Sequence, residues 1–335
     1  MKSICYLVPY FGKLPSNFQV WLDSCSYNET INWIIITNDE TDFLYPKNVK
    51  RIISDFDNIK KIIQSKFDFD VKIDKYWDLS LFKPAYGEIF SNYLEGYDFW
   101  GHCDVDLIWG DIRKFITEDI LNKYEKIGFQ GHSTLYKNKE IVNQRYRTIV
   151  PNKINYIDVF SGKAIYSFDE NSMEDIYKFL NIEYYNVTNF AHLSKYDYSF
   201  YLKYLPKEDD YKNKRQIFMW KNGKLNRLYL TEDKKIGMDE FMYLHFFCRP
   251  IKYKVNHLEK NKIYTIYPDC FEECKLIIDS KYVNKKGKCS KIKYYIRSIY
   301  YNRKKLTMKK IIDNIKRMII YKKTNRRGWY IWKQI

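Results

Sequence analysis

Short apolar runs alternate with amphipathic stretches over the first third of the chain. Residues 3–8 are apolar and are followed by Pro9, whereas the apolar side chains in 17–26 recur at the three- and four-residue spacing of a helix. Residues 32–37 form a continuous apolar run of the kind that is buried on both faces of a sheet. The pattern predicts two strands with a helix between them.

The same alternation continues along the chain. Pro84 stands at a favourable first position for a helix that runs to Tyr93, and Gly96 is suited to cap its end. The remaining predicted elements are strands at 49–54, 97–109 and 123–130, helices at 58–66 and 173–180, a strand and turn at 156–168, and a polar surface insertion at 206–216. Strand–helix alternation with short connections predicts an α/β fold. Its sheet is expected to be mostly parallel, Rossmann-like and flanked by helices, with a ligand crevice at the carboxyl ends of the strands.

Length and cysteine content narrow the class of protein. The chain of 335 residues is 45% hydrophobic and 30% charged, which suits one large or two medium folded domains and excludes a disordered or collagen-like protein. No run of about 18 apolar residues occurs, so no membrane-spanning helix is expected. Seven cysteines at irregular spacing argue against a disulfide framework and favour a reducing, cytoplasmic location.

The net charge of +17 is confined to the end of the chain. Residues 281–335 hold 19 Lys and Arg against one acid, Asp313, whereas the other 39 bases and 40 acids nearly cancel. This shift in composition predicts a boundary between a folded domain at 1–280 and a basic segment at 281–335. Because the body of the chain is neutral, a polyanionic partner is expected to bind through the basic segment.

Two aspartates close the predicted strand at 97–109. Residues two apart in a strand share a face, so Asp104 and Asp106 are expected to project together into the crevice. Mg²⁺ and Mn²⁺ prefer such carboxylate oxygens and complete their coordination with substrate phosphates. Two other Asp-x-Asp triplets, at 55–57 and 68–70, lie in a turn and in a charged segment. From the residues alone, Asp104 and Asp106 form either a metal site or a solvated turn.

The segment around these aspartates resembles a known family. Residues 82–87 (FKPAYG) and 97–111 (YDFWGHCDVDLIWGD), together with 8–12 (VPYFG), are similar to bacterial glycosyltransferases of the GT-A fold that build capsular and other surface polysaccharides. The resemblance covers about residues 1–255 and does not extend to the basic segment. It implies a GT-A-like catalytic domain and a nucleotide-sugar donor.

The resemblance also implies how the donor is held. A Mn²⁺ or Mg²⁺ ion on Asp104 and Asp106 is expected to bridge the diphosphate of a UDP-sugar. The base and ribose are expected near Pro9, Tyr10, Phe11, Asn38 and Asp39.

Two further places are candidates for donor binding. Lys83 is the candidate cation for the phosphates, with the partial positive charge of a helix N-terminus behind it, or else an exposed lysine at a helix start. Ser161 and Gly162 are expected either to line the donor sugar, since glycine permits close backbone approach, or to form a plain turn.

His245 lies in an apolar stretch and has two interpretations. It is either a core histidine or a third metal ligand, since neutral imidazole binds Mn²⁺. Retaining GT-A enzymes similar to glycogenin and to the lipopolysaccharide galactosyltransferases carry such a histidine in the pattern His-x-x-Gly-x-x-Lys-Pro-Trp. In this chain Cys248 replaces the glycine and Ile251 replaces the lysine, so Arg249 or Lys252 is the candidate phosphate contact. The resemblance favours transfer with retention.

Several acids and histidines have less distinctive surroundings. Three carboxylates are candidates for contact with the transferring sugar or the acceptor hydroxyl, and a surface acid is the alternative for each: Asp197, Asp239 and Glu240. His102 and His132 are expected to be structural, and no role is assigned to His192 or His257.

Residues 291–335 combine basic pairs with apolar side chains at helical spacing and carry Trp329, Tyr330 and Trp332 near the end. A basic amphipathic helix suits an anionic membrane surface, where each base contributes about 1 kcal/mol. This predicts a peripheral protein on the inner face of the cell membrane, beside a lipid-linked glycan acceptor. The alternatives are a helix packed on the catalytic domain and a nucleic-acid-binding arm.

These features predict a metal-dependent glycosyltransferase that moves a sugar from a nucleotide sugar to a lipid-linked surface polysaccharide. A metal-dependent nucleotidyltransferase would also use paired aspartates, but it usually has a glycine-rich phosphate loop, and the sequence contains none. A nucleic-acid-binding protein would explain the basic segment, but it is expected to have a basic body as well.

Overall fold

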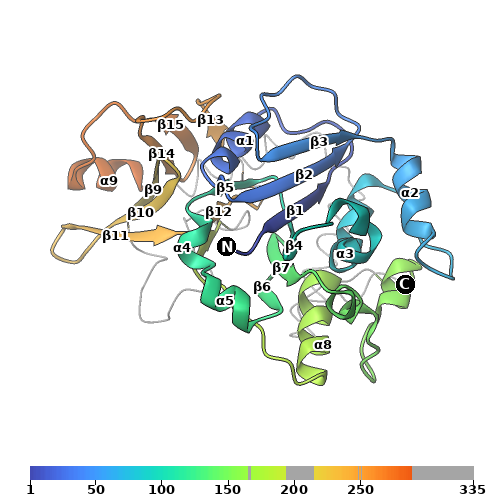
Figure 1. The fold of residues 1–335 in the computed structure, drawn as a ribbon. Helices are drawn as coiled ribbons and strands as arrows, with labels where there is room; N and C mark the ends of the chain where they lie inside the picture. Colours follow the sequence, from blue (N-terminus) through green and yellow to red (C-terminus); the bar gives the residue numbers. More distant parts are fainter. Residues whose placement is uncertain (165–166, 194–214, 248, 250, 289–335) are drawn as a thin grey trace, which may run out of the picture.

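The computed structural model describes residues 1–164, 167–193, 215–247, 249 and 251–288 as a mixed α/β protein with three β-sheets (Figure 1). One six-stranded sheet belongs to the N-terminal part of the chain, and a second lies to the left in Figure 1. A three-stranded sheet contributes residues to the cores of both. The predicted α/β class, with a sheet flanked by helices, is confirmed.

The first sheet consists of β1 (Ile4–Pro9), β2 (Ile31–Thr37), β3 (Val49–Ile53), β4 (Phe99–Cys103), β6 (Lys126–Gln130) and β7 (Ser133–Lys137). Its strand order is β3-β2-β1-β4-β7-β6. The first four strands in this order pair in parallel, whereas β7 is antiparallel to both β4 and β6. The sheet is therefore mostly parallel, as predicted, with an antiparallel hairpin at one edge.

Helices cover both faces of the first sheet because successive side chains of its strands enter two different cores. In β1, Cys5 and Leu7 belong to one core, and Ile4 and Tyr6 belong to the other. The first core is closed by α2 (Phe56–Gln64), α3 (Tyr86–Ile89), α6 (Glu140–Asn143), α7 (Tyr156–Phe160) and α8 (Met173–Phe179). The second core is closed by α1 (Phe18–Ser26), α4 (Ile112–Phe115) and α5 (Glu118–Lys123).

Two further sheets were absent from the predicted elements. The second sheet has the order β11-β10-β9-β14-β15-β13 and contains β9 (Gln216–Lys221), β10 (Lys224–Leu230), β11 (Ile236–Phe241), β13 (Lys252–Tyr253), β14 (Tyr264–Tyr267) and β15 (Cys270–Glu273). The third contains β5 (Leu107–Trp109), β12 (Tyr243–His245) and β8 (Phe190–His192), with β12 in the middle. Part of the predicted insertion at 206–216 enters β9, and its residues 206–214 lie outside the described residues.

The single strand predicted at 97–109 is wrong, because the segment forms β4 and β5 in two different sheets. Both strands are fully buried, which is why the apolar run in the sequence is almost continuous. The turn at 104–106 separates them and takes the two aspartates out of the strand.

Two other predicted elements also differ. Pro84 lies inside the 3₁₀ helix Tyr76–Ala85, ahead of α3, and not at the first position of a long helix. The strand predicted at 156–168 is wrong because Asn155 begins the helix α7. The Asn155 side chain accepts hydrogen bonds from the backbone N–H groups of Ile157 and Asp158, which is the arrangement of a helix N-cap.

The first residues of the basic segment pack on the second sheet. The helix α9 (Ser280–Lys286) buries Val283 in a cluster with Ile217 and Leu228, and Nζ of Lys286 lies 2.7 Å from Oε1 of Glu272. Residues 289–335 lie outside the described residues.

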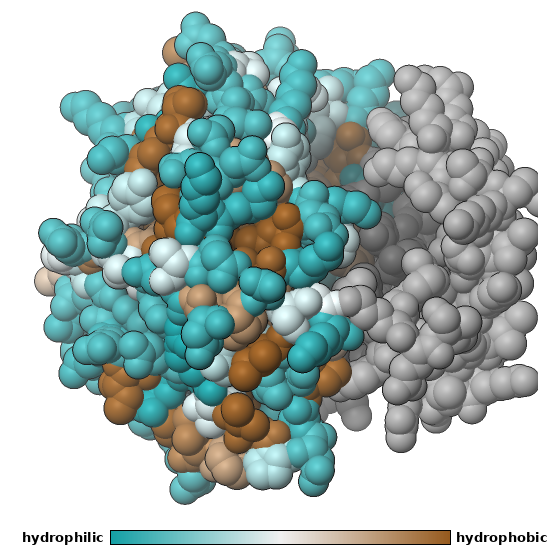
Figure 2. Space-filling model, turned by 90° about the vertical axis from the view of Figure 1, so that its right-hand side faces the viewer, coloured by the Kyte–Doolittle hydropathy of each residue, from teal (hydrophilic) through white to brown (hydrophobic). Residues whose placement is uncertain are grey.

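No helix in the described ranges is both long and apolar enough to span a bilayer. On the face drawn in Figure 2, hydrophobic side chains form separate patches among hydrophilic ones.

Candidate active site

A cleft of about 1300 Å³ opens at the carboxyl ends of β1 and β4. These strands are parallel neighbours, so Pro9 at the end of β1 and Asp104 directly after β4 lie at the same edge of the sheet. The turn between β6 and β7 adds Gln130, Gly131 and His132 to the lining. The carboxyl edge of parallel strands is where α/β proteins generally bind ligands.

Asp104, Asp106 and His245 come together in this cleft. Nε2 of His245 lies 3.3 Å from Oδ1 of Asp106 and 3.8 Å from Oδ2 of Asp104. Strand pairing brings them together, because β12 pairs with β5 and aligns His245 with Leu107, the residue after Asp106. About a third of each aspartate side chain is exposed, whereas His245 is buried, so the carboxylates are accessible from the cleft.

These three side chains form a donor set that suits a divalent metal ion. One ligand atom from each lies within 4.8 Å of the other two. Two carboxylate oxygens and one imidazole nitrogen match the preferences of Mn²⁺, and the carboxylates match those of Mg²⁺.

Lys83 forms an ion pair with Asp104. Its ammonium donates to Oδ1 of Asp104 at 2.6 Å and to the carbonyl of Gly131 at 2.8 Å, and it lies 4.0 Å from Oδ2 of Asp169. Burial alone would lower the pKa of Lys83, but the carboxylates of Asp104 and Asp169 outweigh burial and raise the pKa above its usual value. Lys83 is therefore charged, and it holds the Asp104 carboxylate in place.

Asp169 and Glu170 also line the cleft, although no sequence pattern singles them out. The N–H of Gly131 donates to Oε1 of Glu170 at 3.0 Å. Burial raises the pKa of Asp169 to about 7, although the nearby Lys83 acts in the opposite direction. The two acids belong to the π-helical turn Phe168–Ser172 ahead of α8. Acids just before a helix are common for dipole reasons alone, so no distinct signal marked them.

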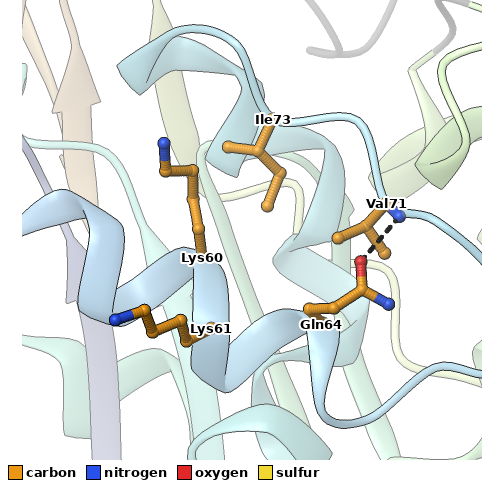
Figure 3. A pocket seen from close by; sticks show the side chains of 5 residues that line it. All are labelled: Lys60, Lys61, Gln64, Val71 and Ile73. Carbon is orange, nitrogen blue, oxygen red and sulfur yellow. Dashed lines mark hydrogen bonds between the residues drawn. The ribbon is translucent and has the colours of Figure 1, made fainter.

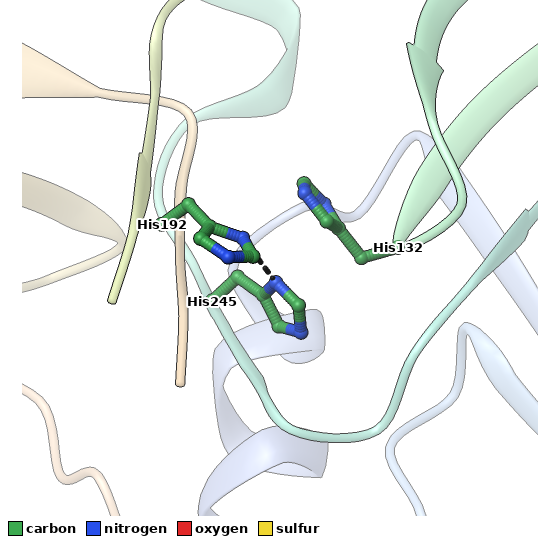
Figure 4. Close-up of side chains that lie close together, drawn as sticks. All are labelled: His132, His192 and His245. Carbon is green, nitrogen blue, oxygen red and sulfur yellow. Dashed lines mark hydrogen bonds between the residues drawn. The ribbon is translucent and has the colours of Figure 1, made fainter. Parts of the chain in front are cut away.

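His132 and His192 lie beside His245 in the cleft lining (Figure 4). Nδ1 of His192 is 2.9 Å from Nδ1 of His245, and the ring centroids of His132 and His245 are 4.2 Å apart. From the sequence, His132 is expected to be structural and no role is assigned to His192. The only local signal was the Gly-His pair that follows the strand at 126–130.

An aromatic wall borders the cleft near the end of β1. Tyr10, Phe11, Tyr76 and Trp77 are among the lining residues. Tyr76 and Trp77 are 46% and 51% exposed, and the rings of Phe11 and Tyr76 are 6.2 Å apart. Partly exposed aromatic rings of this kind can stack on a flat ligand ring.

Asn38 and Asp39 are not among the residues that line the cleft, but they contact the loop beside this wall. Oδ1 of Asn38 accepts a hydrogen bond from the N–H of Gly12 at 2.8 Å, and the Asp39 carboxylate accepts one from the N–H of Leu14. Because these contacts hold the loop that follows Tyr10 and Phe11, Asn38 and Asp39 position the aromatic wall from outside the cleft.

The remaining predicted site residues are placed elsewhere. Asp239 pairs with Arg227 and Glu240 pairs with Lys114. Arg249 is buried and donates to the carbonyl of Pro268 at 3.1 Å.

Ser161 and Gly162 form the end of α7, where Gly162 has a φ of 73°. Neither they nor Asp239, Glu240 and Arg249 are among the cleft-lining residues, and Asp197 lies outside the described residues.

A second, smaller hollow of about 210 Å³ lies between α2 and the segment 71–73 (Figure 3). Its lining consists of Lys60, Lys61, Gln64, Val71 and Ile73. Oε1 of Gln64 accepts a hydrogen bond from the N–H of Val71 at 3.0 Å. This lining contains neither acids nor histidines, unlike that of the large cleft.

The fold and the cleft define an α/β protein with a carboxylate–histidine cluster at the carboxyl edge of its parallel strands. The chain belongs to a protein family of unknown function, DUF6625, whose model matches residues 6–275. No curated protein sequence matches the chain.

Solved structures with similarity to this chain include three glycosyltransferases. The galactosyltransferase LgtC, in complex with donor and acceptor sugar analogues, has a TM-score of 0.37 and 11% identity, over 75% of this chain and 88% of its own. Mouse xyloside xylosyltransferase 1 has a TM-score of 0.36 and 11% identity, over 58% and 88%. The glycosyltransferase GlyE of Streptococcus pneumoniae TIGR4 has a TM-score of 0.34 and 10% identity, over 59% and 47%, so the match spans about half of GlyE.

Proposed function

We propose that this protein is a metal-dependent glycosyltransferase that uses a nucleotide-sugar donor. The observation that carries the proposal is the grouping of Asp104, Asp106 and His245 at the carboxyl edge of a parallel sheet. The cleft around them, at about 1300 Å³, exceeds the 300–1,000 Å³ or so of ordinary small-molecule pockets, so it has room for both a nucleotide sugar and part of an acceptor.

In this proposal Asp104, Asp106 and His245 hold Mn²⁺ or Mg²⁺. The bound cation supplies charge stabilisation for the departing diphosphate. Lys83 orients the Asp104 carboxylate through its 2.6 Å contact and adds a fixed positive charge beside the proposed metal site. The carbonyl of Gly131 fixes the Lys83 ammonium from the other side.

The donor base is proposed to stack against the aromatic wall of Tyr10, Phe11, Tyr76 and Trp77. This wall adjoins the end of β1, so a nucleotide stacked there can extend its diphosphate toward Asp104. The assignment of UDP as the nucleotide comes from the resemblance of the sequence around 82–111.

Asp169 and Glu170 are the carboxylates proposed to contact the transferring sugar or the acceptor hydroxyl. They line the cleft, whereas Asp239 and Glu240 are held in ion pairs outside its lining. A carboxyl group whose pKa lies near 7, as for Asp169, can hold or release a proton at neutral pH. Transfer with retention is proposed from His245 and is tested by NMR of the anomeric configuration of the first product.

The acceptor is proposed to be a lipid-linked surface polysaccharide at the inner face of the cell membrane. The support is the charge of residues 281–335, with 19 Lys and Arg and one acid. A basic segment attached to a neutral body would hold the cleft near an anionic membrane.

The proposal is tested by thermal stabilisation of the protein with a panel of UDP- and GDP-sugars, with and without Mn²⁺. One nucleotide sugar is expected to raise the melting temperature only when Mn²⁺ is present. Asp106→Asn is expected to remove this effect. The matched control is Asp70→Asn, an exposed aspartate in another Asp-x-Asp triplet, which should keep it. Stabilisation that persists in Asp106→Asn would contradict the proposed site.

The products identify the reaction. A glycosyltransferase incubated with its donor and Mn²⁺ releases a nucleoside diphosphate, even with water as a slow acceptor. A metal-dependent nucleotidyltransferase supplied with a nucleoside triphosphate releases pyrophosphate instead. Release of pyrophosphate with no turnover of any nucleotide sugar would replace the proposal by that alternative.

A further inference from the structure

Three buried histidines from separate parts of the chain lie close together (Figure 4), and all three line the cleft. His132 follows β6, His192 ends β8, and His245 ends β12. Parallel pairing of β8 with β12 puts His192 in register with His245. One ligand nitrogen from each histidine lies within 4.8 Å of the other two.

The geometry of these nitrogens suits a common ion. Nδ1 of His192 and Nδ1 of His245 are 2.9 Å apart. Because Zn–N distances are about 2.0–2.1 Å, two nitrogens bound to one tetrahedral Zn²⁺ ion lie about 3.3–3.4 Å from each other, so the two rings need to separate by only about 0.5 Å to share an ion. The same ring of His245 turns its other nitrogen, Nε2, toward Asp106. The three-histidine cluster is thus distinct from the Asp104–Asp106 pair, although both use His245.

His132 gives an independent indication of a ligand. It is only 4% exposed, and its Nε2 has no hydrogen-bond partner among the described residues. Its Nδ1 lies 3.0 Å from the hydroxyl of Tyr243. An Nδ1–H that donates to this hydroxyl leaves the Nε2 lone pair available, which is how metal-binding histidines are usually held by a second residue.

Packing alone does not account for this arrangement. If the three rings served only as core side chains, the buried Nε2 of His132 would remain without a partner, which costs free energy. The aromatic neighbours Phe190 and Tyr243 offer no donor to it, since the Tyr243 hydroxyl already contacts Nδ1. A metal ion would satisfy this nitrogen.

We propose that His132, His192 and His245 form a second metal site that binds Zn²⁺ or a similar transition-metal ion through three imidazoles. Three protein ligands leave a fourth position for water or a ligand atom, and all three histidines line the cleft, so this position opens toward it. The site does not depend on the proposed transfer reaction.

The decisive measurement is X-ray absorption spectroscopy of the full-length protein loaded with one equivalent of Zn²⁺. The expected spectrum has three imidazole ligands at about 2.0–2.1 Å. A spectrum with a single imidazole and carboxylate oxygens would put the ion at Asp104 and Asp106 and overturn the proposal. Failure of the protein to bind Zn²⁺ would overturn it as well. This measurement uses the unmodified chain, so it does not depend on the folding of any variant.

Calorimetric titration of variants with Zn²⁺ gives a second test. His132→Phe and His192→Phe are expected to weaken Zn²⁺ binding by more than about tenfold. Asp106→Asn should retain it, as should the control His257→Phe, since His257 is a half-exposed histidine that contacts Asp23. Loss of Zn²⁺ binding in Asp106→Asn with retention in His132→Phe would contradict the three-histidine site. Because Asp106→Asn separates the two sites, failure of the glycosyltransferase proposal would leave this result unchanged.

Discussion

Gly131 is the residue at which the charged groups of the cleft meet. Its carbonyl accepts from Lys83, its N–H donates to Glu170, and a Cβ at this position would lie 2.2 Å from Oδ2 of Asp169. The Asp169 side chain is only 15% exposed and has little room to move aside. Glycine is therefore required here for the close approach of Asp169 to Lys83.

Gly131→Ala is expected to displace Asp169 and weaken donor binding, with a loss of about 1–3 kcal/mol in the free energy of unfolding from the added contact. Titration calorimetry with the donor and urea unfolding measure the two effects. Gly96→Ala is the control: Gly96 has a φ of 80°, and a Cβ added there would have no atom of the described residues within 4 Å, so this variant should lose stability but not donor affinity. Equal donor affinity in wild type and Gly131→Ala would refute the role given to this contact.

Lys126 is a buried lysine in β6. Burial lowers the pKa of Lys126 to about 7, while its ammonium donates to the carbonyl of Gly128 and lies 3.9 Å from the ring centroid of Tyr184. Between this pKa and the value of about 10.4 in an unfolded chain, the unfolded state binds a proton that the folded state does not. Folding therefore becomes more favourable as the pH rises through this window.

In Lys126→Met this titration is absent. Relative to Lys126→Met, the free energy of unfolding of the wild type is expected to increase by about 2–4 kcal/mol from pH 7 to pH 10. Urea unfolding of both proteins at several pH values measures it. A difference that stays constant over this range would show that Lys126 is already charged in the folded protein at pH 10.

At the scale of elements, α7 is a helix formed by residues whose composition favours a strand. Residues 156–160 (YIDVF) have the β-branched and aromatic side chains of a strand, but Asn155 and Asp158 form a capping box that begins a helix. The rings of Tyr156 and Phe160 then pack beside Phe67 in the first core. Capping and tertiary packing together outweigh strand propensity in this segment.

Asn155→Ala removes the cap and is expected to lower the free energy of unfolding by about 1 kcal/mol. The measurement is urea unfolding followed by circular dichroism. Lys163→Ala, at an exposed lysine three residues after α7, provides the control and should change stability little. An unchanged stability in Asn155→Ala would mean that packing alone holds α7.

At the scale of the whole molecule, residues 1–280 are nearly neutral and the positive charge is concentrated in the basic segment at 281–335. Only the start of that segment, α9, lies in the described part of the chain, and there Lys286 pairs with Glu272. Five basic pairs follow, at 304–305, 309–310, 316–317, 322–323 and 326–327. If they bind lipid headgroups, their attraction is electrostatic and screened by salt.

Replacing these five pairs by glutamine in the full-length chain is expected to move the protein from liposomes with anionic lipid to the supernatant in a sedimentation assay. Wild-type binding should weaken as salt increases and should be low on neutral liposomes. The same variant should retain donor binding, because the cleft lies in the body of the molecule. Equal sedimentation of the variant and the wild type would rule out the membrane role of these pairs.

The sequence by itself determined the local features of the protein. Apolar periodicity identified β1, α1, β2, β3 and α2 to within a few residues, because the periods of strand and helix follow from backbone geometry alone. The sequence also singled out Asp104 and Asp106, at the end of an apolar run, and Lys83, before Pro84. All three line the cleft.

Only the tertiary structure decided which distant residues share the cleft. His192 and His245 are 53 residues apart and become neighbours through the register of β8 and β12. Asp169 lies 4.0 Å from Lys83 in a position where a Cβ at Gly131 would come within 2.2 Å of its Oδ2. Tertiary contacts also hold Asp239 and Glu240 outside the cleft lining, in ion pairs with Arg227 and Lys114. Strand register and long-range packing join residues that no local pattern relates, which is why the sequence could nominate the two aspartates but not assemble the site around them.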